Sequence, residues 1–331
     1  MTAVATPAPG AQETAPADDV PMELHEAPSG PDRVFSGVLA AASAVVLLIL
    51  TAIVVFLCYY GWPAVKEAGA GFMTDLTWSP DTGHFGLLPL LVGSLAIALI
   101  GVAIATPVSL ATALMINEYA PRRLKPLLTG VIDLLATVPS IVYGFWGLEL
   151  ISPKQAAPAQ WLATHFGFVP IFRTPTPGSY VNSIFACGLI CAVTIIPIIT
   201  SISREVMAQA PRDVCEAALG LGGTRWGMVT NVIMPFSRNG ILGAVLLGVG
   251  RGLGETMIVV LVLSQGNILT SALLGPNGLG SIAKQITDNF EASSPIYKSG
   301  LILAGLALFV TTLAVNVIAR LIVQRTAAEA V

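Results

Sequence analysis

Long apolar segments separated by polar ones constrain this chain more than any other feature of its sequence. The hydrocarbon core of a bilayer is about 30 Å thick, and a helix needs about 20 residues to cross it. The chain is 54% hydrophobic and 11% charged, which lies outside the range of soluble globular proteins. We therefore predict an all-α polytopic membrane protein whose six transmembrane helices lie at roughly 34–60, 87–116, 124–150, 180–202, 240–263 and 299–323.

Basic residues are unevenly distributed between the segments that join these spans. Cytoplasmic segments of membrane proteins carry an excess of Lys and Arg. With a cytoplasmic N-terminus, the inner segments hold Arg33, Arg122, Arg123, Lys125, Arg204, Arg212, Arg225, Arg238, Arg320 and Arg325. The outer segments then hold Lys66, Lys154, Arg173, Lys284 and Lys298. This asymmetry predicts that both termini and the segment between the fourth and fifth spans are cytoplasmic.

The parts outside the spans differ in composition. Residues 1–32 are rich in Ala, Pro and acidic side chains, and such a segment cannot bury enough apolar surface to fold, so we predict a disordered cytoplasmic tail. A six-helix transmembrane domain is expected at 33–325, with a cytoplasmic end at 326–331. The outer segments, about 62–86, 151–179 and 264–298, are long enough either to meet a partner or to cap the helix bundle.

Several function classes are disfavoured by the sequence. A net charge of −3 without a basic stripe argues against a nucleic-acid partner. Cys187 and Cys191 lie four residues apart within an apolar run and have no His or Asp beside them, which favours buried apolar residues over a metal pair. The sequence contains no GxxxxGK[ST] motif, so the chain is expected to bind no cofactor and to leave the use of ATP and Mg²⁺ to a separate subunit.

A polar element of about twenty residues, EAALGLGGTRWGMVTNVIMP (216–235), stands between the fourth and fifth spans. Its apolar residues repeat at helical spacing on both sides of Gly222-Gly223, and glycine permits a break between two helices. Thr224 is a candidate cap for the second helix, and Pro235 is expected to end the element. The pattern predicts a helix–turn–helix elbow, which on composition alone is a simple connector.

The elbow resembles the EAA loop of ATP-binding-cassette (ABC) importer permeases. Glu216, Ala217, Ala218, Gly222 and Pro235 match the positions of that pattern, whereas Val232 and Met234 replace its usual Ile and Leu. The resemblance implies a coupling loop, placed here at 203–238, that docks into a groove on a separate ATPase subunit.

Two charged residues lie within the expected fifth span. Arg251 is near its middle and Glu255 follows four residues later, so a continuous helix would place them on one face. Each charge costs about 2.5–3.5 kcal/mol at the bilayer centre on insertion scales. The pair either locks the helix against its neighbours or lines a pathway in which the guanidinium binds an oxyanion. Glycines at 248, 250, 252 and 254 favour a close approach or a conduit along the same helix.

Further pathway candidates lie in the expected third span. Asp133 is a candidate partner of Arg251 or Arg238, although its carboxylate could also extend toward the interface. Pro139-Ser140 and Tyr143-Gly144 are expected to interrupt this helix, since proline removes one backbone hydrogen bond. Ser140 and Tyr143 could line a polar path, and a bend that only improves packing would explain them equally well.

Longer blocks narrow the resemblance. Residues 62–69, 137–148 and 216–257 are similar to the PstC family, the permeases of phosphate-importing ABC transporters, and the similarity runs from about residue 33 to the end. It implies the type I ABC importer (MetI-like) fold, the bacterial cytoplasmic membrane and a pathway role for Arg251 and Glu255. It also implies a PstA-like second permease, a PstB-like ATPase homodimer and a PstS-like extracytoplasmic phosphate-binding protein.

Three alternatives remain open at this point. A permease for another oxyanion, such as sulfate or molybdate, would use the same guanidinium chemistry. A gradient-driven transporter would have no use for an ATPase-docking elbow, and a membrane scaffold would make the Arg251–Glu255 pair purely structural. The sequence favours a non-catalytic permease subunit that moves inorganic phosphate inward.

Overall fold

The computed structural model describes residues 30–73, 75–79, 84–154, 156–174, 176, 178–264, 266–291 and 294–328. The predicted tail at 1–32 lies outside these residues except for its last three, which begin the first helix, and the predicted C-terminal end is described only to residue 328. The chain divides into two units, 1–52 and 53–331. In the first unit the described part, 30–52, is helical and exposed throughout.

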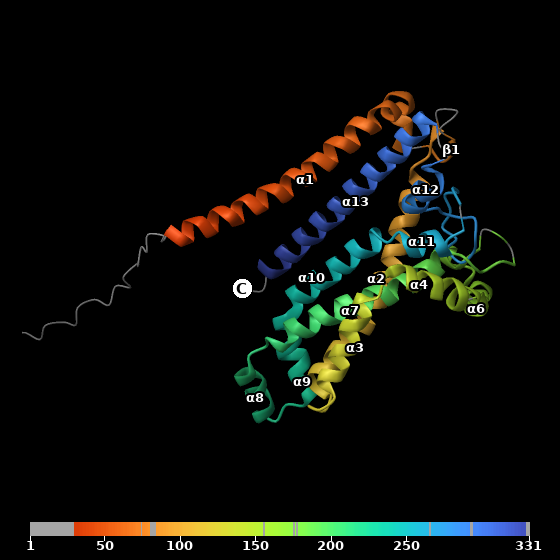
Figure 1. Cartoon of the computed structure of the whole chain (residues 1–331). Coiled ribbons are helices and arrows are strands. Elements are labelled where there is room, and N and C mark those ends of the chain that lie inside the picture. Colours follow the sequence, from red (N-terminus) through yellow and green to blue (C-terminus); the bar gives the residue numbers. More distant parts are fainter. Residues whose placement is uncertain are drawn as a thin grey trace, which may run out of the picture. The chain divides into compact units, whose positions relative to one another are not determined.

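The described residues are predominantly helical (Figure 1). The longer helices are α1 (Gly30–Ala68), α2 (Leu88–Leu114), α3 (Lys125–Thr137), α7 (Ile184–Ala208), α10 (Met234–Leu253) and α13 (Pro295–Ala328). The shorter ones are α4 (Ser140–Trp146), α5 (Ser152–Lys154), α6 (Ala156–Phe166), α8 (Arg212–Gly220), α9 (Arg225–Met228), α11 (Met257–Val262) and α12 (Ile282–Asn289). Single π turns cover Met115–Tyr119, Gly147–Ile151 and Val229–Ile233, and 3₁₀ turns cover Gly69–Met73 and Pro170–Phe172.

One small antiparallel hairpin interrupts the helical pattern. Strand β1 (Trp78–Ser79) pairs with β2 (His84–Phe85), and Trp78 lies opposite Phe85. Phe85 is fully buried beside Leu87 and Leu301. The hairpin therefore closes one end of the second unit with aromatic packing.

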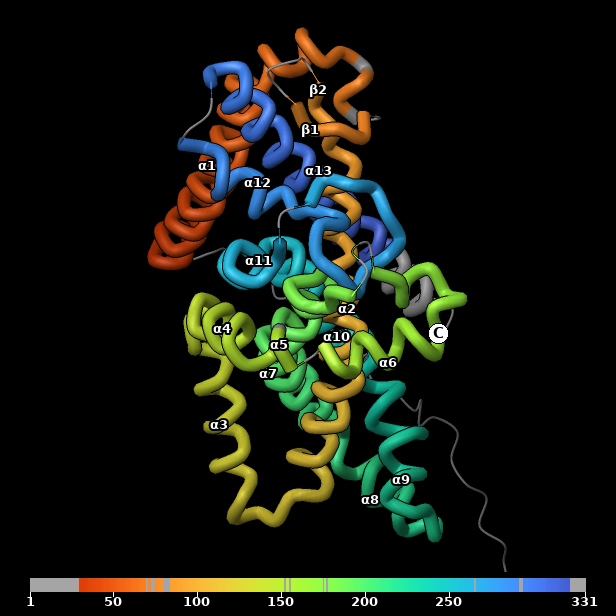
Figure 2. The backbone as a smooth tube through the Cα atoms, turned by 90° about the vertical axis from the view of Figure 1, so that its right-hand side faces the viewer, coloured from red at the N-terminus to blue at the C-terminus, as the bar shows by residue number. Residues whose placement is uncertain are grey.

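The membrane-spanning character predicted from the sequence is confirmed. Five described helices are long and apolar enough to cross a bilayer, and a sixth span results if the bent pair formed by α3 and α4 counts as one. That pair is bent by 89°, and Figure 2 shows α4 turning sharply away from α3. The interruption expected at Pro139-Ser140 is therefore confirmed, because Pro139 supplies no N–H to continue the helical hydrogen bonds.

The fifth span also differs from the prediction. A helix was expected at 240–263, but the helical run begins at Arg225 and ends at Leu253, after which α11 forms a separate short helix. In the structure the second helix of the elbow and the fifth span are one continuous run.

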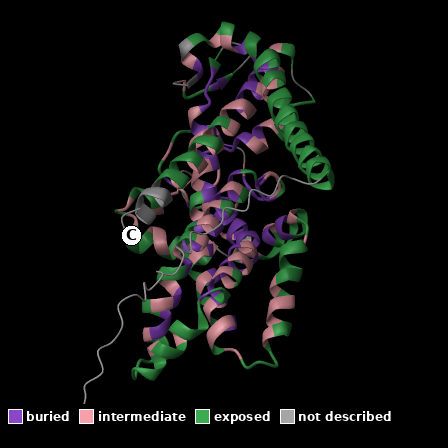
Figure 3. Ribbon diagram, turned by 90° about the vertical axis from the view of Figure 1, so that its left-hand side faces the viewer, coloured by how far each residue is buried: buried purple, intermediate pink, exposed green. Residues whose placement is uncertain are grey.

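The core lies where α2, α7 and α10 pack together, and it is coloured as buried in Figure 3. Small residues bring these helices close, as is usual in membrane proteins. A Cβ on Gly188 would collide with Ile100, and one on Gly252 would lie 3.1 Å from the Cα atom of Ala98. Cys187 and Cys191 are fully buried in this core, which confirms their prediction as apolar packing residues.

The segment between α11 and α12 folds back onto the helices. The Ser94 Oγ atom lies 3.2 Å from the Ser281 Oγ atom and accepts a hydrogen bond of 3.1 Å from the Ile282 N–H. Asn277, in the Gly-Pro-Asn-Gly turn, has φ +59°. Helix α12 follows this turn, and its Ile282 and Gln285 are buried.

Candidate functional site

The break between α3 and α4 has its own hydrogen-bond compensation. In a continuous helix the Leu135 carbonyl would accept a hydrogen bond from residue 139, but Pro139 has no N–H. The Tyr143 hydroxyl donates to this carbonyl at 2.9 Å instead. Tyr143 lies inside α4, so the expectation that Tyr143-Gly144 interrupts the helix is wrong.

The close packing of Gly144 explains why a glycine follows Tyr143. A Cβ at this position would lie 2.7 Å from the Leu261 Cδ1 atom and 3.5 Å from the Ile258 Cα atom. Glycine therefore lets α4 lie directly against α11. This contact brings the break in the third span beside the break in the fifth.

The second break lies at Gly254–Thr256, between α10 and α11. Arg251 is in the last turn of α10, and Glu255 lies beyond the end of that helix. The sequence prediction placed both residues on one continuous helix, which is wrong. The two side chains nevertheless meet, with 3.8 Å between the Arg251 Nη2 and Glu255 Oε2 atoms.

The two members of this ion pair differ in burial. The Glu255 side chain is 5% exposed, whereas the Arg251 side chain is 39% exposed. A buried carboxylate is costly without a nearby positive charge, so Arg251 compensates Glu255. The distance exceeds that of a hydrogen bond, and the exposed part of the guanidinium leaves donors free to face a cavity.

That cavity is a pocket of about 400 Å³, which we call the charge pocket. Both broken helices begin at its wall, α4 with Ser140 and α11 with Met257. Discontinuous membrane helices recur at transporter substrate sites because their ends leave backbone groups available to a ligand. The lining residues are Ser140, Gly250, Arg251, Gly254, Glu255, Thr256 and Met257.

The glycines of this region lie on two different faces of α10. Gly248 packs against Ile195 and Ile199 of α7, and Gly252 packs against α2, so their hydrogens permit close approach. Gly250 lines the charge pocket, where an added Cβ would meet nothing within 4 Å. The close approach is therefore confirmed at Gly248 and Gly252, whereas Gly250 faces a cavity, because a step of two residues turns about 200° around a helix.

The structure separates the three weaker candidates. Ser140 lies in the charge pocket with Arg251 and Glu255. Asp133 is exposed, and its Oδ1 atom accepts a 2.9 Å hydrogen bond from the Ser201 hydroxyl of α7, which joins α3 to α7. Neither Asp133 nor Tyr143 is among the described residues that line the charge pocket.

The predicted elbow is present. Helix α8 ends at Gly220, Gly222 has φ +84°, and the Thr224 hydroxyl caps α9 by accepting a 3.0 Å hydrogen bond from the Gly227 N–H. The elbow lies at the lower end of the second unit in Figures 1 and 2, beyond the end of α7. Its surface includes large apolar side chains, since Leu221 is 91% exposed and Trp226 is also exposed.

Pro235 does not end the elbow as predicted. It lies in the first turn of α10, directly after the π turn Val229–Ile233, in which the Met234 N–H bonds to the Val229 carbonyl. A proline at the start of a helical segment loses a hydrogen bond that the preceding turn has already displaced. The helix therefore passes through Pro235 and connects the elbow directly to Arg251.

Cys215 lies on the side of α8 that faces the rest of the second unit. Desolvation raises the pKa of its thiol, and the neighbouring carboxylates of Glu118 and Glu216 raise that pKa further. Glu118 belongs to the π turn that follows α2. The elbow is thus packed against the end of α2, while Glu216 itself is exposed.

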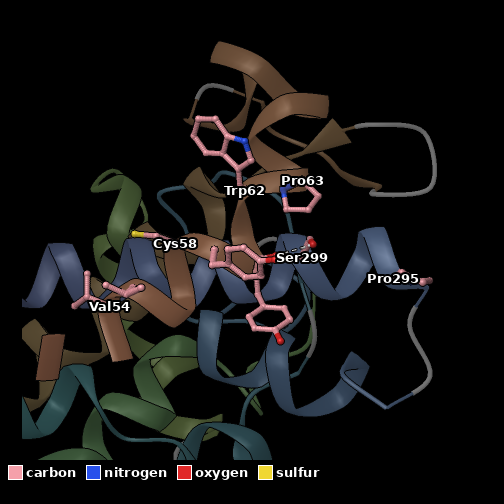
Figure 4. Close-up of a pocket in the computed structure, with 9 residues that line it drawn as sticks. Val54, Cys58, Trp62, Pro63, Pro295 and Ser299 are labelled. Atoms are coloured by element: carbon pink, nitrogen blue, oxygen red, sulfur yellow. Dashed lines mark hydrogen bonds between the residues drawn. The ribbon is translucent and has the colours of Figure 1, made fainter. Parts of the chain in front are cut away.

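A second cavity, which we call the aromatic groove, has a different chemistry. It measures about 780 Å³ and lies between the C-terminal part of α1 and the start of α13. Figure 4 shows its lining and the 2.8 Å hydrogen bond from the Ser299 hydroxyl to the Tyr60 carbonyl. Its walls include Tyr59, Tyr60 and Trp62, and aromatic side chains of this kind favour the membrane interface. Among the described residues that line it none is ionisable as Asp, Glu, Lys, Arg or His, so it offers no charged group to an oxyanion.

Sequence reasoning missed Thr256 and Met257 as pocket residues. They follow Glu255 directly, but the prediction of an unbroken helix would have turned both away from Arg251. The signal was available in Gly252 and Gly254, since two glycines within three residues weaken a helix at its end.

Comparison with known proteins gives a consistent result. Residues 105–328 match the family described as "Binding-protein-dependent transport system inner membrane component". A phosphate transport system permease protein PstC of Xylella fastidiosa is 36% identical over 296 residues, which cover 89% of this chain and 91% of the relative. A PstC of Haemophilus influenzae is 34% identical over 298 residues, covering 89% and 93%.

A solved structure supports the fold. One chain of a bacterial ABC transporter involved in alginate import superposes with a TM-score of 0.58 over 88% of this chain and 99% of its own length, at 15% sequence identity. At this identity the likeness concerns the fold alone, which is the MetI-like fold of ABC importer permeases. By the family match and by the extent of its identity to these relatives, the chain belongs to the PstC family of binding-protein-dependent inner-membrane permeases.

Proposed function

We propose that this chain is the permease subunit of an ABC importer that moves inorganic phosphate into the cytoplasm by alternating access. The observation that carries the proposal is the partly exposed Arg251 guanidinium in a pocket between two broken membrane helices. The relatives named for phosphate transport make phosphate the first substrate to test.

The chemistry of the charge pocket suits a transit site. A guanidinium offers several N–H donors to a tetrahedral oxyanion, and the hydroxyls of Ser140 and Thr256 line the same wall. Glu255 offsets part of the positive charge, which weakens binding. A transported anion must leave the site as readily as it enters, so weak binding favours turnover, and tight selection would belong to a separate binding protein.

The proposed orientation places the elbow in the cytoplasm. It rests on the ten basic residues assigned to inner segments against five in outer ones. Both termini are then cytoplasmic, and the charge pocket faces alternately outward and inward. The protein would be a multi-pass component of the bacterial cytoplasmic membrane.

The elbow is the proposed contact with the ATPase. Leu221 and Trp226 expose apolar surface beside the exposed Glu216, and such a surface fits a groove on another subunit. Glu216, Ala217, Ala218, Gly222 and Pro235 are the residues that the EAA pattern assigns to this contact. Because the helical run continues from Arg225 to Leu253, a displacement of the elbow is transmitted to Arg251.

The proposed assembly contains three other components. A PstA-like permease would complete the pathway, and a PstB-like ATPase homodimer would bind and hydrolyse ATP with Mg²⁺. A PstS-like binding protein would deliver phosphate to the outer side. This chain would have no catalytic activity and no cofactor of its own.

The test is phosphate uptake by cells that lack their own permease and receive this chain with its partner subunits. We expect uptake with the wild type, a severe loss with Arg251→Gln and partial retention with Arg251→Lys. Glu216→Lys should reduce copurification with the ATPase. Normal uptake by a fully expressed and assembled Arg251→Gln variant would exclude the pathway role.

A second candidate substrate follows from the same geometry. A guanidinium and two hydroxyls do not distinguish phosphate from sulfate or molybdate, because all are tetrahedral oxyanions. Uptake of labelled phosphate should be measured in the presence of excess sulfate or molybdate. The same measurement should be made with labelled sulfate, with a purified binding protein for each anion. Efficient uptake of sulfate, with none of phosphate, would assign the chain to the other oxyanion.

A further inference from the structure

A third cavity meets the charge pocket at Arg251. It is a groove of about 920 Å³ between α7, α10 and α13, which we call the α10–α13 groove. Gly250 and Arg251 line both cavities. The guanidinium therefore stands at a junction between a pocket beside the helix breaks and a groove that follows α10 toward its N-terminal end.

The α10 wall of this groove combines glycines with Ala244, Leu246 and Leu247. It extends from Arg251 back to Asn239, a distance of about 18 Å at 1.5 Å per residue. Glycines occupy positions 240, 243 and 250 of this wall, and an added Cβ at Gly243 or Gly250 would meet nothing within 4 Å. At these glycines the wall has no side chain, and the carboxamide of Asn239 lies at its far end.

The α13 wall has a regular helical pattern. Leu313, Asn316, Val317 and Arg320 line the groove, and their spacing of three, four and seven residues places them on one face. The polar members lie toward the C-terminal end of α13, where Asn239 closes the opposite wall. Both asparagines and Arg320 therefore gather at the end of the groove remote from Arg251.

The charge of the groove has one sign. Its described lining residues include Arg251 and Arg320 and contain no Asp or Glu. Arginine and carboxamide N–H groups can replace part of the hydration of an anion, and carboxylates would repel it. A cation would find no counter-charge along this surface.

We propose that the α10–α13 groove is the inward exit route of the transported anion, with Asn239, Asn316 and Arg320 as its last binding groups. This inference rests on the proposed function and orientation, under which the Arg320 end of the groove opens to the cytoplasm. The anion passes from Arg251 along the glycines of the α10 wall to Arg320. A phosphodiester headgroup of an anionic lipid has the same chemistry, and the experiment separates the two sources.

Cysteine accessibility tests the route in the complete transporter. Cys58 and Cys215 are first replaced by serine, whereas Cys187 and Cys191 are fully buried and remain. Gly243→Cys is then treated, in inside-out vesicles, with an anionic membrane-impermeant methanethiosulfonate reagent. Leu242→Cys is the matched control, one residue away on the same helix and outside the groove lining.

We expect Gly243→Cys to react several-fold faster than Leu242→Cys and to be protected by inorganic phosphate but not by chloride at equal ionic strength. An unreactive Gly243→Cys, or one that phosphate does not protect, overturns the proposal. The same labelling is then repeated in vesicles with and without anionic phospholipid. Protection that follows the lipid and not phosphate would assign the groove to a headgroup and also overturn the exit route.

Uptake provides an independent readout. Gly243→Trp fills the floor of the groove and should lower phosphate uptake severely, whereas Leu242→Trp should retain it, with both variants checked for assembly with the ATPase. Arg320→Gln should lower the maximal rate several-fold, and Arg320→Lys should restore most of it. Equal uptake by the two tryptophan variants excludes the route, while an absence of phosphate uptake by the wild type would instead defeat the proposed function.

Discussion

The two helix breaks that meet at the charge pocket are stabilised in different ways. At the first break, the Tyr143 hydroxyl replaces the donor that Pro139 lacks, through a neutral hydrogen bond within one span. At the second, Gly254 ends α10 and an ion pair joins Arg251 to Glu255. The first compensation is local and uncharged, whereas the second is charged and lies in an open pocket.

This difference suggests different roles for the two breaks. Pro139 and the tyrosine that bonds to the freed carbonyl fix the direction of α4, so the first break has a structural role. The ion pair at the second break is longer than a hydrogen bond and has one partly exposed member, so it can exchange contacts with an anion. The following predictions test this division, beginning with the largest expected effect.

Replacement of Arg251 by methionine should have the largest effect. The change removes the guanidinium from the charge pocket and leaves the buried Glu255 carboxylate without its positive partner. We expect phosphate uptake to fall roughly 10- to 100-fold, as for loss of a hydrogen bond to a charged group. Uptake measurements on the assembled transporter check this, and wild-type uptake in this variant would make the second break structural, like the first.

Packing of the helix end against α2 gives the next prediction. A Cβ on Gly252 would lie 3.1 Å from the Ala98 backbone, whereas one on Gly250 would lie in open space. Gly252→Val should therefore destabilise the protein by about 1–3 kcal/mol through overpacking. Thermal unfolding in detergent provides the measurement, and Gly250→Val, which adds the same side chain two residues away, is the control. Equal destabilisation by both substitutions would contradict the two-face arrangement.

Neutralising Glu255 should change binding more than stability. In Glu255→Gln the guanidinium is no longer offset, so the anion is held more tightly and released more slowly. Because the ion pair is partly exposed, we expect the binding free energy of phosphate to change by about 1 kcal/mol. This corresponds to a change of roughly fivefold in the half-saturating phosphate concentration. Uptake is measured over a range of phosphate concentrations. Both the half-saturating concentration and the maximal rate should be lower than in the wild type. A higher half-saturating concentration would show that Glu255 assists binding.

The smallest effect is expected at the first break. Tyr143→Phe removes the hydroxyl that bonds to the Leu135 carbonyl and should cost about 0.6 kcal/mol, typical of a hydrogen bond within a membrane. Phosphate uptake should remain close to that of the wild type. Tyr119→Phe, at an exposed tyrosine in the π turn after α2, controls for the general loss of a hydroxyl. A large transport defect in Tyr143→Phe alone would move this tyrosine into the pathway.

The spans and the elbow were predictable because their signals are local. Apolar length identifies a membrane helix, and the capped turn at Gly222 and Thr224 follows from the preferences of neighbouring residues. The Tyr143 contact was also within reach, since its acceptor Leu135 lies four residues before Pro139. A search for the donor that replaces a proline N–H would have found it.

The charge pocket could not be predicted in full because it combines distant segments. Ser140 reaches Arg251 only because α4 turns by 89° from α3 and lies against α11 at Gly144. The last turn of α10 packs at Gly252 against Ala98 of α2, a contact between segments far apart in the sequence. A periodic pattern assumes a straight helix, so it assigned Glu255 to the correct partner by the wrong geometry.

The position of Arg251 between two cavities has a mechanical consequence. Successive residues on a helix are separated by about 100° around its axis, and Gly250 and Arg251 both border the charge pocket and the α10–α13 groove. A modest axial rotation of the helical run from Arg225 to Leu253 would therefore swing the guanidinium from one cavity to the other. Torque applied at the elbow, and not only tilt, would then be sufficient to direct the anion.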